Sequence, residues 1–246
     1  MNSIDSILSN IASLDLPDDK KDKLRFYTQL VLKDQNPFYS TSELKKWVDE
    51  LREKTTIRLK NKPVNQLRKW KVDPENGEIY HESGEFFKIV GVEIENTQRE
   101  VQGWDQPIVF QKEMGVLGII RCTFGGVYHY LLNAKVEPGN TYLYQISPTL
   151  QATYSNLKKA HGGRRPKFAE YFDEDSSATV IYKHWLAEDG GRFLAKSNLN
   201  ILIEIDKSSL PEIPDDYRWF TLSQIKELLC YDNYINPHVR SILCHL

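Results

Sequence analysis

The segment from Ala134 to Asn156, AKVEPGNTYLYQISPTLQATYSN, places the strongest constraint on how this chain folds. It follows an apolar, strand-like run, GVYHYLL, and it turns at Pro138-Gly139-Asn140 into a second β-prone run, TYLYQIS. Glutamine, asparagine and hydroxyl side chains outnumber its two charged ones. The segment therefore predicts strands that carry many neutral hydrogen-bonding groups.

The strand before the turn, VYHYLLNAKVE, has two faces of different character. Alternation places Tyr128, Tyr130, Leu132, Ala134 and Val136 on one face and His129, Leu131, Asn133, Lys135 and Glu137 on the other. We expect the first face to build core and the second to be polar, as on a solvent-facing strand. At about 3.4 Å per residue, Glu137 lies roughly 7 Å from Lys135 but about 27 Å from His129. Lys135 and Glu137 can therefore serve one small ligand, and His129 is expected to be structural.

Composition excludes several classes of protein. With 246 residues and 40% hydrophobic content, the chain can bury a core of its own. A net charge of -2 gives no basic footprint for nucleic acid, and no apolar run approaches the roughly 20 residues of a membrane span. The first residues lack the pattern of a secretory signal, so we expect a cytoplasmic protein. Three widely spaced cysteines predict buried thiols and no metal site.

The chain divides into an N-terminal helical segment, residues 1–62, and a β-rich module, residues 63–246, that ends in helices. Ser40 and Glu43 have the spacing of a capping box, and so do Thr221 and Gln224. A second short helix is expected from Pro237. The dipeptides Asn76-Gly77 and Asp189-Gly190 predict hairpin turns.

Polar residues after the turn favour a polyhydroxylated ligand bearing phosphate. Sugars are recognised by directional neutral hydrogen bonds, and the run from Ser147 to Asn156 offers many of them. The following Gly162-Gly163-Arg164-Arg165 offers flexible backbone amides and guanidinium groups that pair with phosphate. The same residues also fit a capped helix that has a cationic last turn and ends at glycine. Such a helix needs no ligand.

Four runs carry a family resemblance, and they are WDQPIVFQKEMGVLGII (104–120), GGVYHYLLNAKVEPGN (125–140), SPTLQATYSN (147–156) and RWFTLSQIKELLCYDNYIN (218–236). From about Trp70 onward the chain resembles the nucleotide-diphospho-hexose 2,3-dehydratases. The resemblance implies a Nudix-like α/β (α+β) fold, a mixed β-sheet flanked by helices, and a nucleotide-sugar substrate. Family members usually contain two such modules in tandem, with one pocket active, whereas this chain has one copy. The Nudix metal-binding core R-E-x-x-E-E is absent, since Arg52-Glu53 continues KTT.

The implied reaction needs no cofactor. A ketone at carbon 4 of a 4-keto-6-deoxyhexose acidifies the hydrogen on carbon 3, so a base can form an enolate that expels the carbon 2 hydroxyl as water. The sequence has neither a G-x-G-x-x-G nor a G-x-x-x-x-G-K-[ST] motif. We therefore expect a lyase of deoxysugar biosynthesis without metal or nicotinamide.

Candidate catalytic residues follow from this chemistry. Glu137 is the first candidate for the base, and Lys135 for stabilising the enolate oxygen or holding a phosphate, although the two fit equally a structural ion pair with each other. Tyr154 and His161 are candidate acids, and His161 also fits an exposed histidine at a helix end.

Candidate binding residues are assigned by chemical type. Arg164 and Arg165 are assigned to the pyrophosphate, and Trp104 to the nucleobase or, alternatively, to packing. The sugar and base edges are assigned to Gln145, Ser147, Thr149, Gln151 and Asn156. A catalytically silent nucleotide-sugar-binding subunit remains the alternative to an enzyme, and an isomerase or epimerase would share the first step. A lone module exposes the surface that a tandem pair shares, so we expect a homodimer.

Overall fold

The computed structural model describes residues 4–32, 35–96, 98, 100–157, 165–244 and 246. Six α-helices are described, namely α1 (Ile4–Ala12), α2 (Asp18–Val31), α3 (Thr41–Lys54), α4 (Tyr154–Leu157), α5 (Leu222–Leu228) and α6 (Pro237–Leu243). Three 3-10 turns are η1 (Val64–Gln66), η2 (Ala169–Phe172) and η3 (Lys207–Ser209). The strands are β1 (Trp70–Val72), β2 (Ile79–His81), β3 (Lys88–Ile94), β4 (Trp104–Phe110), β5 (Gly115–Phe124), β6 (Val127–Val136), β7 (Tyr144–Ser147), β8 (Leu150–Thr153), β9 (Thr179–Ala187), β10 (Ser197–Glu204) and β11 (Tyr217–Thr221).

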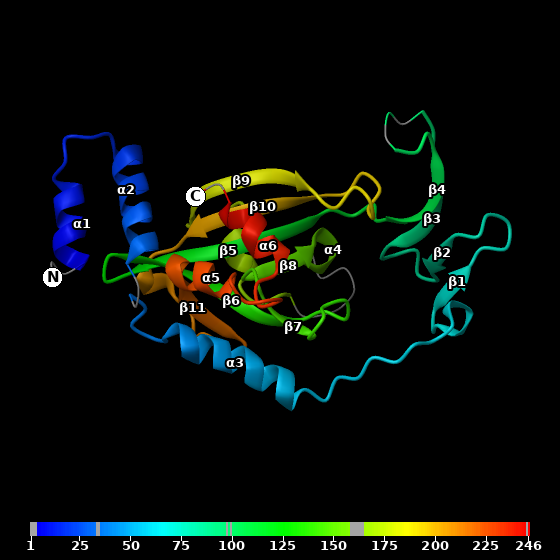
Figure 1. Ribbon diagram of the computed structural model, residues 1–246, viewed down its shortest axis with the longest axis horizontal. Helices are drawn as coiled ribbons and strands as arrows, with labels where there is room; N and C mark the ends of the chain where they lie inside the picture. The colour runs from blue at the N-terminus through cyan, green and yellow to red at the C-terminus, as the bar shows by residue number, and fades with distance from the viewer. Residues whose placement is uncertain (1–3, 33–34, 97, 99, 158–164, 245) are drawn as a thin grey trace.

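A seven-stranded mixed sheet forms the body of the molecule (Figure 1). Its main path runs β11-β6-β5-β10-β9, while β7 pairs with β6 and β8 pairs with β5. The β5–β10 pair is parallel and the other pairs are antiparallel. The α/β class with a mixed sheet flanked by helices is therefore confirmed.

The hairpin of β5 and β6 splits in the middle of this sheet. The two strands pair only as far as Ile120 opposite Leu131. Beyond that point β8 pairs with β5 and β7 pairs with β6, so the continuous segment 144–153 bends between the two branches at Pro148. The buried Thr149 hydroxyl lies at the split, where it accepts from the Ile120 N–H at 3.0 Å and donates to the Leu131 carbonyl. It replaces the backbone hydrogen bond that the diverging strands no longer make.

Both faces of the large sheet are covered. Leu44 and Val48 of α3, together with residues of α5 and α6, pack on the face that carries Leu132 and Ile146. The segments around Phe168 and Ile213 pack on the other face, which carries Leu131. The expectation that alternate residues of β6 form a solvent-facing side is therefore wrong for Leu131, which is fully buried. His129 is fully buried too, with its Nδ1 atom 2.9 Å from the Val127 carbonyl, as expected of a structural residue.

The helix starts follow from local sequence. Both capping boxes form, at Ser40 with Glu43 and at Thr221 with Gln224, and α6 begins at Pro237 as expected. The N-terminal helices end at Lys54, and residues 56–69 contain only the η1 turn and irregular or turn structure and are exposed. The boundary at residue 62 stays a prediction, although α3 on its N-terminal side shares the main core.

Two further expectations have mixed outcomes. Asn76-Gly77 lies in the turn that joins the antiparallel strands β1 and β2, with Gly77 at a φ of 76°, and Asp189-Gly190 lies in the loop that joins β9 and β10. Among the cysteines, Cys122 is buried, but Cys230 and Cys244 are exposed. The prediction of three buried thiols is wrong for these two, because they lie where α5 and α6 end at the surface.

Replacing Thr149 by valine should destabilise the fold without changing the volume of the side chain. The Ile120 N–H and the Leu131 carbonyl would both lose a partner in the core, which costs about 2–4 kcal/mol in free energy of unfolding. Chemical denaturation measures this loss. The control is Thr179→Val on the exposed start of β9, which should leave stability nearly unchanged. Equal effects of the two substitutions would show that Thr149 does not hold the split.

Candidate active site

A polar cavity of about 420 Å³ opens beside the split in the sheet. It is lined by Gln111, Gly115, Leu117, Lys135, Gln151, Ala152, Thr153, Asn156, Glu188, Phe193, Lys196, Asn198 and His238. Lys135 belongs to β6 and Gln151 to β8, so the two branches of the split both contribute to it. Its volume lies within the range of small-molecule sites, and convergent polar groups mark it as the candidate site.

Two other hollows, of about 400 and 330 Å³, differ in chemistry. Both lie along α2 and include Phe26, Tyr27 and Leu246 in their walls. The larger one runs between α2, α5 and α6 and is mostly apolar. They offer fewer groups suited to a sugar.

Lys135 and Glu137 lie in contact on one side of the cavity. The Lys135 ammonium is 2.8 Å from the Glu137 Oε1 atom, and each side chain is 33% exposed. The Gln151 amide donates to the same Glu137 oxygen at 3.4 Å. The Gln151 Oε1 atom is buried and has no hydrogen-bond partner among the described residues. A buried acceptor of this kind is available to a ligand or a water molecule.

The opposite wall is built by the start of β10 and the loop before it. Lys196 is buried and donates to the Glu113 carbonyl, and burial lowers the pKa of its ammonium group. Asn198 donates to the Glu188 carboxylate and accepts from the Gly115 N–H at 2.9 Å. A Cβ atom on Gly115 would lie 2.8 Å from the Asn198 Oδ1 atom, so this close approach requires glycine.

His238, at the start of α6, completes the cavity. The preceding Asn236 caps this helix by accepting from the His238 N–H at 2.9 Å, and its amide donates to Gln145 at 3.2 Å. Burial lowers the pKa of the His238 imidazole, as does the charge of Lys135, while the carboxylates of Glu188 and Glu137 oppose the shift. Burial is the largest of these influences, and it favours the neutral form of the imidazole.

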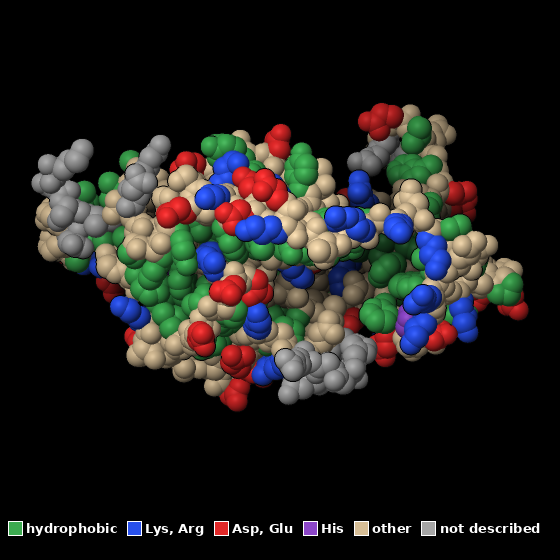
Figure 2. All heavy atoms as spheres, turned by 90° about the horizontal axis from the view of Figure 1, so that it is seen from below, with side chains coloured by type: hydrophobic (Ala, Val, Ile, Leu, Met, Phe, Trp, Pro, Cys, Tyr) green, Lys and Arg blue, Asp and Glu red, His purple; other side chains and the backbone are tan. Residues whose placement is uncertain are grey.

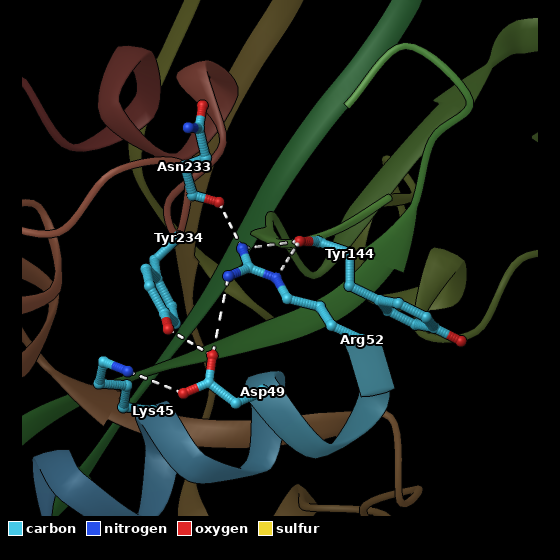
Figure 3. A network of polar contacts seen from close by, with 6 residues as sticks. All are labelled: Lys45, Asp49, Arg52, Tyr144, Asn233 and Tyr234. Carbon is cyan, nitrogen blue, oxygen red and sulfur yellow. Dashed lines mark hydrogen bonds and ion pairs between the residues drawn. The ribbon is translucent and has the colours of Figure 1, made fainter. Parts of the chain in front are cut away.

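A network on α3 fixes the two segments that carry Gln145 and Asn236 (Figure 3). The Arg52 guanidinium donates to the Tyr144 carbonyl at 3.1 Å and to the Asn233 carbonyl at 2.6 Å. Asp49 is 3.8 Å from Arg52 and accepts from Lys45 at 2.7 Å and from the Tyr234 hydroxyl. The hydrogen bonds and charges of these partners lower the Asp49 pKa, although burial alone would raise it. Helix α3 therefore connects β7 to the segment before α6.

Several of the residues selected from the sequence meet at the cavity. Lys135, Gln151 and Asn156 line it, and Glu137 touches two of them. Gln145 lies behind the wall in its bond to Asn236. The Ser147 hydroxyl is buried without a partner among the described residues, and the Thr149 hydroxyl is occupied at the split. The roles predicted for the residues that line or touch the cavity stay proposals. Thr149 has a structural role, because its hydroxyl is used at the split.

The other selected residues lie elsewhere. Trp104 is on β4 and donates to Gln106 at 2.8 Å. Tyr154, at the start of α4, is exposed and is not among the residues that line the cavity. Arg165 forms an ion pair with Asp173 and donates to the Ala169 carbonyl at 3.4 Å. His161 and Arg164 lie outside the described residues. The roles expected for these five residues stay predictions.

Most of the polar cavity residues were not selected from the sequence, among them Glu188, Lys196, Asn198 and His238. They are isolated polar residues in the pattern, and no motif groups them. The pair Asn236-Pro237 predicts the start of the helix that carries His238. No neighbouring residue in the sequence indicates that His238 would face the cavity.

The described part of the chain has no cluster of three or more His, Cys, Asp or Glu residues arranged to hold a metal ion. No described helix is long and apolar enough to cross a membrane.

Replacing Arg52 by leucine should loosen β7 and the segment before α6 together. Two backbone carbonyls would lose a charged donor, which costs on the order of 2–4 kcal/mol in free energy of unfolding. Lys54→Leu on the same helix removes only an exposed ion pair with Glu50 and should change little. Denaturation curves compare the two variants, and an Arg52 variant no less stable than the Lys54 variant would contradict the role of this network.

Comparison with known proteins places the chain in a family. A family model described as NDP-hexose 2,3-dehydratase matches residues 41–246, which includes α3. A dTDP-4-dehydro-6-deoxy-alpha-D-glucopyranose 2,3-dehydratase of Amycolatopsis orientalis is 40% identical over 210 residues, which are 82% of this chain and 44% of that protein. Proteins of the same name from Saccharopolyspora spinosa and Streptomyces violaceoruber are 35% and 36% identical, over 85% and 81% of this chain.

Solved structures give a weaker likeness. A C. elegans Ap4A hydrolase, crystallised alone and as a binary complex, is 15% and 12% identical, with TM-scores of 0.33 and 0.31. The overlap covers 48% and 49% of this chain and 87% and 88% of those chains. TM-scores of this size establish no common fold, so the Nudix-like part of the expected fold stays a prediction.

The chain spans less than half the length of the curated relatives it matches, 44%, 42% and 45% of the three. The match nevertheless runs through α3, the split sheet and the terminal helices that build the cavity. On this evidence the chain belongs to the NDP-hexose 2,3-dehydratase family.

Proposed function

We propose that this chain is a nucleotide-diphospho-4-keto-6-deoxyhexose 2,3-dehydratase, a carbon–oxygen lyase, with its active site in the polar cavity. The names of the curated relatives make dTDP-4-dehydro-6-deoxy-α-D-glucopyranose the first substrate to consider. The observation that carries the proposal is the contact between Lys135 and Glu137 at the cavity wall. It puts a carboxylate and a cation within reach of one sugar ring.

The reaction divides into two steps. The Glu137 carboxylate removes the proton from carbon 3, and the electrons of that bond move to the oxygen on carbon 4 to form an enolate. The Lys135 ammonium stabilises this oxygen. The carbonyl at carbon 4 then re-forms, a double bond forms between carbons 2 and 3, and the bond from carbon 2 to its hydroxyl breaks. One proton joins the departing hydroxyl, so the net loss is one water.

The cavity wall supplies the remaining interactions. Gln151 and Asn156 bind sugar hydroxyls, and the buried Gln151 Oε1 atom is an unused acceptor. The proton that Glu137 takes up can return to the departing hydroxyl directly. Tyr154 and His161 remain the donors selected from the sequence, and His238 joins them because it lines the cavity.

The Lys135–Glu137 ion pair also favours a second candidate function. At 2.8 Å the pair satisfies both groups without any substrate, as a structural pair would. The chain would then bind a nucleotide sugar and support a separate active module. The chain covers less than half the length of each relative. This share is as compatible with a binding subunit as with a self-sufficient enzyme.

The proposal includes a homodimer and a cytoplasmic location. The dimer is supported by the length of the relatives, since each contains more than twice the length that this chain matches. No cofactor is part of the proposal, because the enolate can be stabilised by Lys135 and amide donors.

Replacing Glu137 by glutamine should remove proton abstraction while keeping the shape of the side chain. Turnover should fall by roughly 10² to 10⁴, with little change in substrate affinity, and exchange of the carbon 3 hydrogen with deuterated water should fall with it. The assay contains EDTA and no nicotinamide, and restoration of activity by a divalent ion would contradict the cofactor-free reaction.

The matched control is Glu78→Gln, which removes another partly exposed carboxylate that pairs with a lysine, Lys88, at 3.2 Å. Its turnover should equal that of the wild type. If the Glu137 variant binds substrate and still exchanges the carbon 3 hydrogen at the normal rate, Glu137 is a structural residue and not the base.

A further inference from the structure

Residues 55–110 form an arm that stands apart from the large sheet (Figure 1). It begins with a strap, residues 55–69, and continues into the antiparallel sheet β1-β2-β3-β4. Of the described residues between 55 and 110, only Ile108 is buried. A small sheet needs an apolar face packed against something to be stable. Among the described residues, none therefore covers the apolar face of the arm.

The exposed surface of the arm is apolar as well as extended. Eight large hydrophobic side chains on it are exposed, namely Ile57, Leu59, Val64, Leu67, Val72, Phe86, Phe87 and Val101. Phe87 stacks at 5.0 Å on Trp70, whose ring lies 5.5 Å from that of His81. Exposed apolar side chains in this number on one arm favour an interaction site.

The strap and β1 together are strongly basic. Residues 55–72 contain Arg58, Lys60, Lys62, Arg68, Lys69 and Lys71 and no aspartate or glutamate. Within the described part of the chain, none of these six cations forms an ion pair. Figure 2 shows Lys and Arg side chains gathered over the end of the molecule where Figure 1 places the strap and β1–β4.

A complementary acidic surface exists on the same chain. The run Glu170 to Asp175, EYFDED, has four carboxylates in six residues. Asp173 pairs with Arg165, but Glu170, Glu174 and Asp175 are exposed and form no ion pair among the described residues. A chain with a net charge of -2 thus separates a basic strap from an acidic run.

The arm is joined to the candidate site through β4. The Val109 N–H donates to the Arg192 carbonyl at 2.8 Å, and the Leu194 N–H donates to the Val109 carbonyl at 2.9 Å. Phe193, between these two, lines the polar cavity. A partner that covers the arm would therefore stand next to the site.

We propose that the arm docks on a second copy of this chain, with the basic strap of each copy against the acidic run of the other. The inference rests on the homodimer of the proposed function and names its interface. A two-fold dimer makes such a contact twice, because each copy contributes both surfaces. The occupant is a second copy because the relatives contain more than twice the length matched here and because this chain carries both opposite charges.

A charge-swap experiment tests the interface. In the first variant Lys60 and Lys62 become glutamate, and in the second Glu174 and Asp175 become lysine. Each variant alone brings like charges together, so the dissociation constant of its dimer should rise by roughly tenfold or more. An equimolar mixture pairs opposite charges at both contacts and should recover the dimer mass in light scattering.

The control is Tyr27→Asp, at an exposed residue of the apolar hollow beside α2, which should leave the dimer intact. Leu59→Asp, at an exposed residue of the strap, should weaken it. A monomeric wild type at micromolar concentration would overturn the proposal. So would a dimer that survives both charge reversals, or one that dissociates with Tyr27→Asp and persists with Leu59→Asp.

Light scattering and the dehydration assay give separate answers. A wild-type dimer that responds to the charge swap but releases no water supports the interface and rejects the enzyme. A monomer that dehydrates the substrate rejects the interface and leaves the reaction standing.

Discussion

The hydroxyl of Thr149 is the interaction on which the rest of the structure depends. It bonds the Ile120 N–H and the Leu131 carbonyl at the point where β5 and β6 separate. Without a donor and acceptor at this position, two buried backbone groups would stay unpaired, so the hairpin could not open inside the core. The backbone carbonyl of Thr149 also accepts from the Tyr217 hydroxyl at 3.2 Å, which connects the split to β11. Because the hairpin opens, segment 144–153 can pair with both of its strands, β7 with β6 and β8 with β5.

The geometry of the candidate site follows from that split. Lys135 lies on one branch and Gln151 on the other, and Glu137 touches both side chains. Because Arg52 holds the Tyr144 and Asn233 carbonyls, α3 keeps β7 and the start of α6 together. The packing of α3 on the main core therefore contributes to the placement of His238, although the two are distant in sequence. Burial of His238 and Lys196 lowers the pKa of both groups.

Local features of the fold could be predicted from the sequence, and features set by distant contacts could not. The capping boxes at Ser40 and Thr221 depend on residues three positions apart, so the pattern contains them. The contact of Lys135 with Glu137 follows from the period of a strand. Alternation does not show whether both faces of a strand are covered, which is why Leu131 was expected on an open face.

The cavity itself needed the structure. Lys196 and Asn198 reach it through the pairing of β10 with β5, which joins residues about 80 positions apart. The resemblance of SPTLQATYSN to its family identified the polar segment, but it did not separate Gln151, which lines the cavity, from Thr149, which holds the split. These two polar side chains differ in role here because Thr149 lies in the bend between β7 and β8, whereas Gln151 lies on β8.

The central claim is that the cavity beside the split dehydrates a nucleotide sugar. Mass spectrometry of dTDP-4-dehydro-6-deoxy-α-D-glucopyranose after incubation with the wild-type chain tests it most directly. A product lighter by one water should form only when the protein is present. Recovery of the unchanged substrate, from a protein that binds it, would contradict the claim and assign the chain to nucleotide-sugar binding without catalysis.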